Sequence, residues 1–297
     1  MSWKTRALIA AIWMAVFTPF QPTGGIAVSE DLPEILDRGT LRHLGVPYAN
    51  FVTGSGDGMD VELVKGFARE LGVEYVFVES RWADIIADLT GQKVRLSGDN
   101  VETVGDAPVR GDLIANGFTV LPWRQKVVAF SSPTFPTQVW LVARADYDMR
   151  PITPSGDIDS DIGAVKQMLR GVSVLGISNT CLDPSLYHIG SLGAVEELFP
   201  GRLNELAPAL IAGKADTTLL DVPDALIALE KWPGQIKVIG PVSAEQTMAV
   251  GFRKDAPELL NAYNRYLEKA KADGTYIRLV KNYYPAVFGY YPDFFIE

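Results

Sequence analysis

The sequence contains few of the side chains on which metal sites and nucleophilic enzymes depend. Its 297 residues include one cysteine, Cys181, and two histidines, His43 and His188. One cysteine cannot form a disulfide within a chain, and two histidines cannot build a three-histidine zinc site. Cys181 and His188 could be read as a thiol and its base, but no third group that would orient the base is evident. An isolated cysteine usually behaves as a small apolar residue.

The motifs that hold phosphates or zinc are also missing. No GxxxxGK[ST], no GxGxxG after a strand, no HExxH and no CxxC occurs, so phosphate, dinucleotide and metal sites are unsupported. The 36 acidic residues show no spacing that singles out a glycosidase pair. Basic residues number only 27, and the resulting negative charge disfavours nucleic acid and anionic lipid as partners. These absences predict a binding protein without cofactors rather than an enzyme.

The first residues have the order of an export signal. Lys4 and Arg6 precede an apolar run over residues 7–17, which is too short to cross a bilayer, and a small-residue stretch ends at Ser29. We expect residues 1–29 to be a cleaved signal peptide; a buried helix or an uncleaved anchor is the alternative. No cysteine lies nearby to carry a lipid anchor. The remaining chain has 25 basic and 36 acidic residues, a net charge of −11.

Strand and helix patterns alternate along the rest of the chain. Strands are expected at residues 41–46, 74–80 and 112–120, with helical stripes from Val64 to Leu71 and from Trp82 to Leu89. The same alternation follows residue 150, with strands at 171–177, 213–221, 236–240 and 248–252 and helices at 222–232 and 260–270. The pattern predicts two α/β blocks with largely parallel sheets. Pro, Gly and Asp residues near 149–161 suit a connection between them.

Two segments stand out within the first block. Residues 92–111 contain SGDN between apolar residues, which is typical of a short hairpin, and we expect an exposed excursion without a binding role. Residues 117–133, GFTVLPWRQKVVAFSSP, place Arg124 among apolar and aromatic residues. A buried arginine keeps its charge and needs an anion, either an acid of this chain or a carboxylate from a ligand.

Six stretches in order resemble the periplasmic solute-binding proteins of polar amino acid ABC importers, the bacterial extracellular solute-binding protein family 3. They are GMDVELVKGFARELG (58–72), WADIIADLTGQK (82–93), DLIANGFTVLPWRQKVVAFSSPTF (112–135), GVSVLGISNTC (171–181), LIAGKADTTLLDVPDAL (210–226) and Gly274-Thr275-Tyr276. The resemblance covers nearly the whole chain after residue 29. It implies an α/β, two-lobed periplasmic-binding-protein-like fold (type II), with mixed, mostly parallel sheets flanked by helices and two hinge strands.

The family topology further implies discontinuous lobes. Lobe one would comprise residues 30–138 and 247–297, and lobe two residues 139–246, with QVWLVA and MAVGF as the hinge strands. The order of the two blocks along the sequence does not reveal that residues 247–297 return to lobe one.

The resemblance assigns the ligand carboxylate to Arg124, whose planar guanidinium matches a carboxylate. Gly117 and Thr119 match positions where backbone and hydroxyl meet the ligand; ordinary strand roles are the alternative. Asn179, Thr180 and Cys181 match a Gly-Thr-Ser or Gly-Thr-Thr turn whose N–H groups would receive the same carboxylate. A plain helix cap at this turn is equally compatible with the sequence.

Asp221 matches the acid that pairs with a ligand ammonium group, although Pro223 after it is also typical of a helix N-cap. Trp82 and Tyr48, and less directly Phe51, match aromatic residues that line the cleft. Trp82 also heads a helical apolar stripe and could be a core residue.

Four features depart from the family pattern near the expected cleft. Leu121 stands where Thr is frequent, Trp123 replaces an acid, Asn179 replaces Gly, and residues 92–111 are longer than the usual link. They leave open a carboxylate ligand without an amine, or a bulkier polar one.

We therefore expect a monomeric periplasmic protein, not lipid-anchored, that closes on an amino acid or organic acid and delivers it to an ABC permease. The alternatives are a sensor or accessory binding protein, and a relative of the non-catalytic lobe of lytic transglycosylases. The second would need a catalytic domain for which a chain ending at Glu297 leaves no room.

Overall fold

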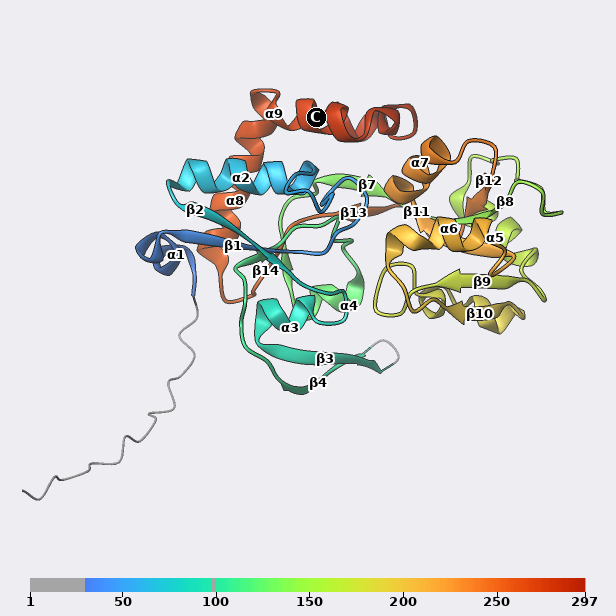
Figure 1. The fold of residues 1–297 in the computed structure, drawn as a ribbon, viewed down its shortest axis with the longest axis horizontal. Coiled ribbons are helices and arrows are strands. Elements are labelled where there is room, and N and C mark those ends of the chain that lie inside the picture. Colours follow the sequence, from blue (N-terminus) through green and yellow to red (C-terminus); the bar gives the residue numbers. More distant parts are fainter. Residues whose placement is uncertain (1–29, 98–99, 297) are drawn as a thin grey trace, which may run out of the picture.

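A computed structural model describes residues 30–97 and 100–296 of the chain. The predicted signal peptide lies outside the described residues. Two five-stranded sheets, each flanked by helices, form two lobes that lie side by side (Figure 1). We name the lobes after the order in which their sheets begin along the chain.

The sheet of lobe one has the strand order β2-β1-β5-β14-β6. Its strands are β1 Thr40–Gly45, β2 Glu74–Glu79, β5 Leu113–Ile114, β6 Ala129–Phe130 and β14 Gly251–Phe252. β1 pairs in parallel with β2 and β5, whereas β14 runs antiparallel to β5 and β6. Its helices are α1 Leu32–Arg38, α2 Met59–Leu71, α3 Ile85–Thr90, α4 Pro122–Gln125, α8 Pro257–Ala272 and α9 Thr275–Tyr283.

The sheet of lobe two has the order β10-β9-β11-β8-β12, and β8 runs antiparallel to both of its neighbours. The strands are β8 Val139–Arg144, β9 Ser173–Gly176, β10 Val195–Leu198, β11 Thr217–Asp221 and β12 Ile236–Pro241. The helices are α5 Ile158–Gln167, α6 Leu206–Ile211 and α7 Val222–Lys231. Three short 3-10 helices, η1 Pro184–Tyr187, η2 Ile189–Leu192 and η3 Leu203–Glu205, complete the lobe.

Two connections cross between the lobes and pair with each other. β7 Phe135–Thr137 and β13 Gln246–Met248 form an antiparallel ribbon, which leads into β8 on one side and toward β14 on the other. β14 thus joins the sheet of lobe one although it follows all of lobe two in the sequence. The two α/β blocks are confirmed, but the linear division near residues 149–161 is wrong. The boundaries at residues 138/139 and 246/247 stay predictions.

Local sequence explains most of the element ends. α2 ends at Gly72 and α3 at Gly91, both with positive φ, because a glycine without Cβ adopts the left-handed conformation that closes a helix. The expected strand at 112–120 is wrong beyond Ile114: Gly117 has a φ of 64°, so the chain leaves the sheet there. The expected helix at 82–89 begins only at Ile85, which places Trp82 in the turn before α3.

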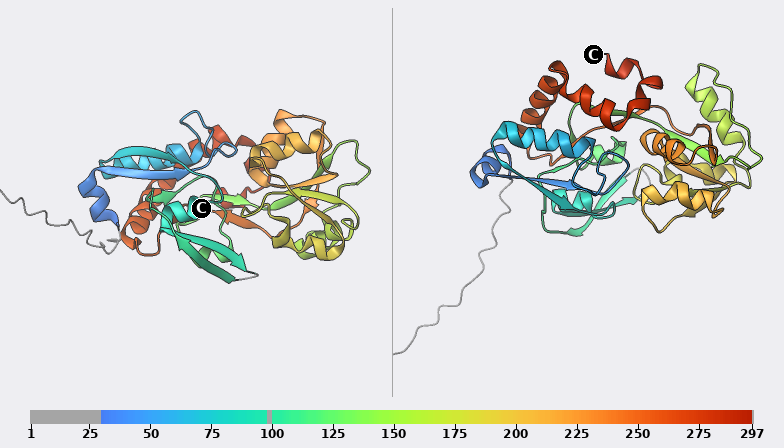
Figure 2. Two further views of the ribbon diagram at one scale, coloured as in Figure 1. Left: turned by 60° about the horizontal axis from the view of Figure 1, so that its bottom comes forward. Right: turned by 45° about the horizontal axis from the view of Figure 1, so that its top comes forward.

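Residues 92–111 form the expected hairpin. β3 Gln92–Ser97 pairs antiparallel with β4 Asn100–Asp106 in a separate two-stranded sheet. The hairpin packs beside α3 and projects from lobe one (Figures 1 and 2).

The last described residues extend from lobe one toward lobe two. After α9, the 3-10 helices η4 Pro285–Gly289 and η5 Asp293–Phe295 continue toward α7 of lobe two (Figure 2). The ring of Tyr290 lies 5.7 Å from that of Trp140 in β8. No helix in the described parts of the chain has the length and hydropathy needed to cross a membrane.

Candidate functional site

Arg124 lies in α4, at the junction of the two lobes, and is 1% exposed. Its Nη1 donates a hydrogen bond to the Thr119 carbonyl oxygen at 3.0 Å, and its buried Nε has no acceptor among the described residues. The guanidinium carbon lies 4.3 Å from the ring centroid of Phe118, 5.3 Å from that of Trp123 and 5.8 Å from that of Trp82. Three aromatic rings therefore surround the cation without neutralising it.

No carboxylate of the described chain pairs with Arg124. Burial lowers the pKa of its guanidinium to about 10, and the groups that oppose this shift are the Cys181 thiol and the Tyr187 hydroxyl of lobe two. The side chain is still a cation at neutral pH. A buried cation that contacts only aromatic rings and weak acids is not neutralised, so a bound anion would stabilise it.

Gly117 and Thr119 lie on the loop between β5 and α4, in contact with other parts of lobe one. The Gly117 N–H donates to Asp60 Oδ2 at 2.7 Å. A Cβ at Gly117 would lie 2.5 Å from the Phe51 ring, so this loop needs glycine for its φ and for the close approach. Thr119 is buried and forms a bridge with Met248 of β13.

Asp221 is the last residue of β11 and is fully buried. Its Oδ1 accepts from the Asp224 N–H at 3.3 Å, so it caps α7, and from the Tyr48 hydroxyl of lobe one. Its Oδ2 accepts from the Cys181 thiol at 3.6 Å. Burial raises the pKa of Asp221 to about 6, against the opposing effect of these hydrogen bonds. The N-cap that the sequence predicts is confirmed.

The turn at residues 178–182 faces Arg124 from lobe two. The Thr180 hydroxyl donates to the Ile177 carbonyl and accepts from the Leu182 N–H, at 2.7 and 3.0 Å. Asn179 has a φ of 62°, a conformation that glycine adopts readily and asparagine more easily than most residues. The polar turn in SNTCLDPSL (178–186) predicts the start of a helix, and the helix that follows, η1, is a single 3-10 turn that ends at the left-handed His188.

Cys181 lies between the two lobes. Burial and the Asp221 charge raise the pKa of its thiol to about 12, while Arg124 and the Thr119 hydroxyl of lobe one act in the opposite direction. His188 is exposed and His43 is buried in β1, where burial lowers its pKa to about 4. Neither histidine lies among the groups that perturb the thiol.

The aromatic positions divide between the lobe junction and the core of lobe one. Tyr48 packs edge-on against Trp82, with ring centroids 5.8 Å apart, and reaches Asp221. Phe51 instead packs against Phe135 and Tyr284 within the core of lobe one, at 5.2 and 4.9 Å. It supports the Gly117 loop from behind.

Sequence reasoning missed three members of this arrangement. Phe118 stacks on Arg124; Tyr187 contacts the Cys181 carbonyl and lies beside Gln246 of β13; Asp60 anchors the Gly117 loop. Phe118 lies in the same 117–133 stretch as Arg124, so the sequence already places a ring near the cation. Asp60 lies inside the quoted 58–72 stretch, but its contact with Gly117 depends on folding, and Tyr187 has no distinguishing pattern in the sequence.

Residues 108–286 match the model of the bacterial extracellular solute-binding proteins, family 3. The chain belongs to this family. Its relatives include the histidine-binding periplasmic protein of Escherichia coli K12, which is 23% identical over 76% of this chain and 78% of the relative. The membrane-bound lytic murein transglycosylase F of Desulfosudis oleivorans is 26% identical over 77% of this chain. This chain spans 44% of that enzyme, less than half of its length.

Solved family folds superpose on the two lobes. A mutant of ArgBP from T. maritima has a TM-score of 0.67 and 26% identity, and the match covers 86% of this chain and 99% of ArgBP. An ancestral amino acid-binding protein, described as a precursor of cyclohexadienyl dehydratase, has a TM-score of 0.65 and 26% identity over 85% and 98% of the two chains. These matches confirm the two-lobed fold.

Proposed function

We propose that this protein binds a small solute carrying a carboxylate, an amino acid or a related organic acid, between its lobes in the periplasm and presents it to an ABC importer permease. One observation carries the proposal: Arg124 is a buried cation at the lobe junction with no carboxylate partner among the described residues. The relatives support the ligand class, since histidine-binding and arginine-bound proteins are among them.

The arrangement of charges explains how a ligand would close the lobes. A carboxylate on Arg124 and the Thr119 loop of lobe one would also meet the 179–181 turn of lobe two. An ammonium group would meet Asp221, whose carboxylate is ionised above a pKa of about 6. Only the closed form brings both sets of groups to one ligand, so the ligand stabilises that form.

Titration calorimetry against amino acids and organic acids tests the proposal. Each hydrogen bond to a charged group contributes about 1.5–3 kcal/mol, so Arg124→Ala should weaken binding by roughly 100-fold or more. Arg144→Ala is the matched control, because Arg144 pairs with Asp146 at the surface of lobe two. Equal affinity in the Arg124 variant and the wild type would disprove the proposed carboxylate site.

The transglycosylase relative favours a second candidate, in which this chain acts as a binding region associated with cell-wall turnover. The similarity covers less than half of that enzyme. Sedimentation with insoluble purified peptidoglycan separates the candidates: co-sedimentation of the protein would support the cell-wall candidate, and the proposed solute-binding role predicts none.

A further inference from the structure

A cavity of about 260 Å³ lies beside Arg124, between the β3–β4 hairpin, α3 and the turn at Asn179. Eight of its eleven lining residues are apolar, among them Val94, Leu96 and Val104 of the hairpin. A water molecule fills about 30 Å³ of the liquid, so the volume corresponds to roughly nine waters. The space has the size of an organic group, and its lining is mixed, because Asp84, Lys93 and Asn179 add polar atoms to the apolar side chains.

The cavity adjoins the proposed carboxylate site through two shared residues. Trp82 and Trp123 line the cavity, and their ring centroids lie 5.8 and 5.3 Å from the guanidinium carbon of Arg124. These two rings join the cavity to the surroundings of Arg124, although Arg124 itself does not line the cavity. The indole N–H of Trp123 is buried without an acceptor among the described residues.

Three of the four departures from the family pattern meet at this cavity. Trp123, Asn179 and the hairpin are far apart in the sequence, yet each contributes to the lining. Asn179 keeps the left-handed backbone of the turn while adding an amide to the rim. Three of the departures from the family pattern thus lie on one side of the proposed carboxylate site. Asn179 contributes to this side from lobe two.

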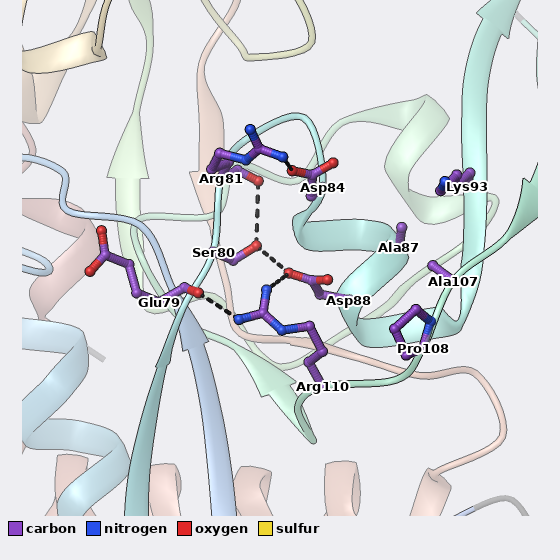
Figure 3. Close-up of a pocket in the computed structure, with 10 residues that line it drawn as sticks. All are labelled: Glu79, Ser80, Arg81, Asp84, Ala87, Asp88, Lys93, Ala107, Pro108 and Arg110. Atoms are coloured by element: carbon purple, nitrogen blue, oxygen red, sulfur yellow. Dashed lines mark hydrogen bonds and ion pairs between the residues drawn. The ribbon is translucent and has the colours of Figure 1, made fainter.

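The charges of the cavity disfavour a cationic ligand side chain. Asp84, the one acid among its described lining residues, forms an ion pair with Arg81 at 2.5 Å. Lys93 adds a positive charge at the same end. Asp84 and Lys93 also border a separate polar cavity on lobe one, where Arg110 bonds Asp88 (Figure 3). No acid is left to neutralise a ligand cation.

We propose that this cavity is a specificity subsite for an aromatic or large aliphatic group of the ligand, formed by the hairpin, Trp82, Trp123 and Asn179. The proposal rests on the proposed carboxylate site and names its ligand class. It replaces our expectation that residues 92–111 have no binding role. The ligand would be an apolar amino acid or the matching organic acid rather than histidine or arginine.

Calorimetry with L-tryptophan, L-phenylalanine, phenylpyruvate, L-alanine and L-arginine tests this subsite. We expect at least one of the three aromatic probes to bind tenfold or more tightly than both L-alanine and L-arginine. Tighter binding of L-arginine would overturn the subsite while leaving carboxylate capture intact. Binding of all five probes that does not depend on Arg124 would instead refute the carboxylate site itself.

Two variants locate the effect in the cavity. Ala83→Trp adds a ring at an exposed lining position, and Val104→Glu puts a charge on the lining face of the hairpin, where Val104 is 53% exposed. Both should weaken binding of the preferred aromatic probe at least tenfold and change L-alanine binding less than twofold. Val109→Glu is the matched control, because Val109 is 39% exposed in the same segment but lines a different cavity.

Ala83 and Val104 are both exposed, so we expect the variants to fold. Circular dichroism and thermal unfolding measure whether they do. If both cavity variants retain wild-type affinity for the aromatic probe, the subsite is disproved. Equal losses in Val109→Glu and Val104→Glu would likewise disprove it, because the effect would then not belong to this cavity.

Discussion

Asp60 shows how a single buried acid can hold a loop in place. It lies in the first turn of α2, and its Oδ2 accepts the Gly117 N–H at 2.7 Å while its Oδ1 has no partner among the described residues. Burial raises the pKa of Asp60 to about 7, and the hydrogen bond from Gly117 only partly offsets this. Near neutral pH the carboxyl group is therefore half protonated.

The raised pKa of Asp60 predicts a pH dependence of stability. The folded protein holds this proton more tightly than the unfolded chain, so the contribution is present below pH 3.8 and is lost as the pH rises to about 7. Asp60→Asn keeps an acceptor for Gly117 but does not titrate. We expect its free energy of unfolding to exceed that of the wild type by up to about 4 kcal/mol at pH 8, with the difference vanishing near pH 4.

Urea unfolding at pH 4, 6 and 8 measures this difference. Asp60→Ala, which removes the acceptor, should lower ligand affinity because the Gly117 loop loses its anchor. A pH-independent difference between the wild type and Asp60→Asn would show that Asp60 is ionised throughout.

At the residue scale, the sequence singles out candidate binding residues more readily than the residues that support them. Arg124 could be singled out because a cation in an apolar stretch needs an anion, whatever the fold. Asp60 could not, because its partner Gly117 is 57 positions away and the bond depends on how α2 packs. Tyr187 was missed for the same reason.

At the level of elements, the start of α7 combines a helix cap with a contact to the other lobe. Asp221 caps the helix by accepting from the Asp224 N–H and also accepts from the Tyr48 hydroxyl of the other lobe. Its second oxygen accepts only the weak thiol donor of Cys181. The carboxylate can thus cap the helix and still meet a ligand ammonium group.

Two substitutions at Asp221 separate these roles. Asp221→Ala removes the cap and leaves the Tyr48 hydroxyl unpaired, so the free energy of unfolding should fall by about 2 kcal/mol or more. Asp221→Asn retains an acceptor and should change it by less than about 1 kcal/mol, yet it removes the charge.

Ligand binding completes the comparison at Asp221. We expect Asp221→Asn to weaken binding of an amino acid at least tenfold, while the corresponding 2-oxo acid, which lacks the ammonium group, loses less than threefold. Calorimetry on the paired ligands measures both. Equal losses for the two ligands would contradict a role of Asp221 in binding the amine.

Element boundaries were harder to predict at the site than elsewhere. α8 and α7 follow their apolar stripes, whereas the expected strand at 112–120 ends at Ile114 and the expected helix at Trp82 begins at Ile85. In both places tertiary contacts override local pattern: the chain leaves regular structure so that Thr119, Arg124 and Trp82 face the lobe junction.

At the scale of the molecule, the linear sequence could not reveal the exchange of segments between lobes. β14 has the apolar pattern of any buried strand, and nothing in that pattern says which sheet it joins. Only the family resemblance implied that the chain crosses between the lobes. In the structure, the β7–β13 ribbon forms this crossing. The crossing ribbon lies beside the site, since Thr119 bridges Met248 of β13.

The contacts between lobes define a closed arrangement. Tyr48 bonds Asp221, and the Ala49 N–H donates to Asn204 Oδ1 at 2.9 Å. Tyr48, Arg124 and Asp221 are almost fully buried at this junction, so opening would expose them to water. A ligand bridging Arg124 and Asp221 would supply the missing free energy of closure.

Closure should be measurable through Cys181, the single cysteine of the chain. Its thiol is 5% exposed between the lobes and has a pKa of about 12, so it is neither accessible nor ionised in the closed form. Alkylation requires the thiolate, and opening exposes the thiol to water. We expect saturating ligand to slow iodoacetamide labelling at pH 8 by at least tenfold, because the labelling rate follows the open population. Arg124→Ala should label at one rate with and without ligand, and Cys181→Ser should not label. Ligand binding that leaves the wild-type labelling rate unchanged would show that the lobes do not close over the solute.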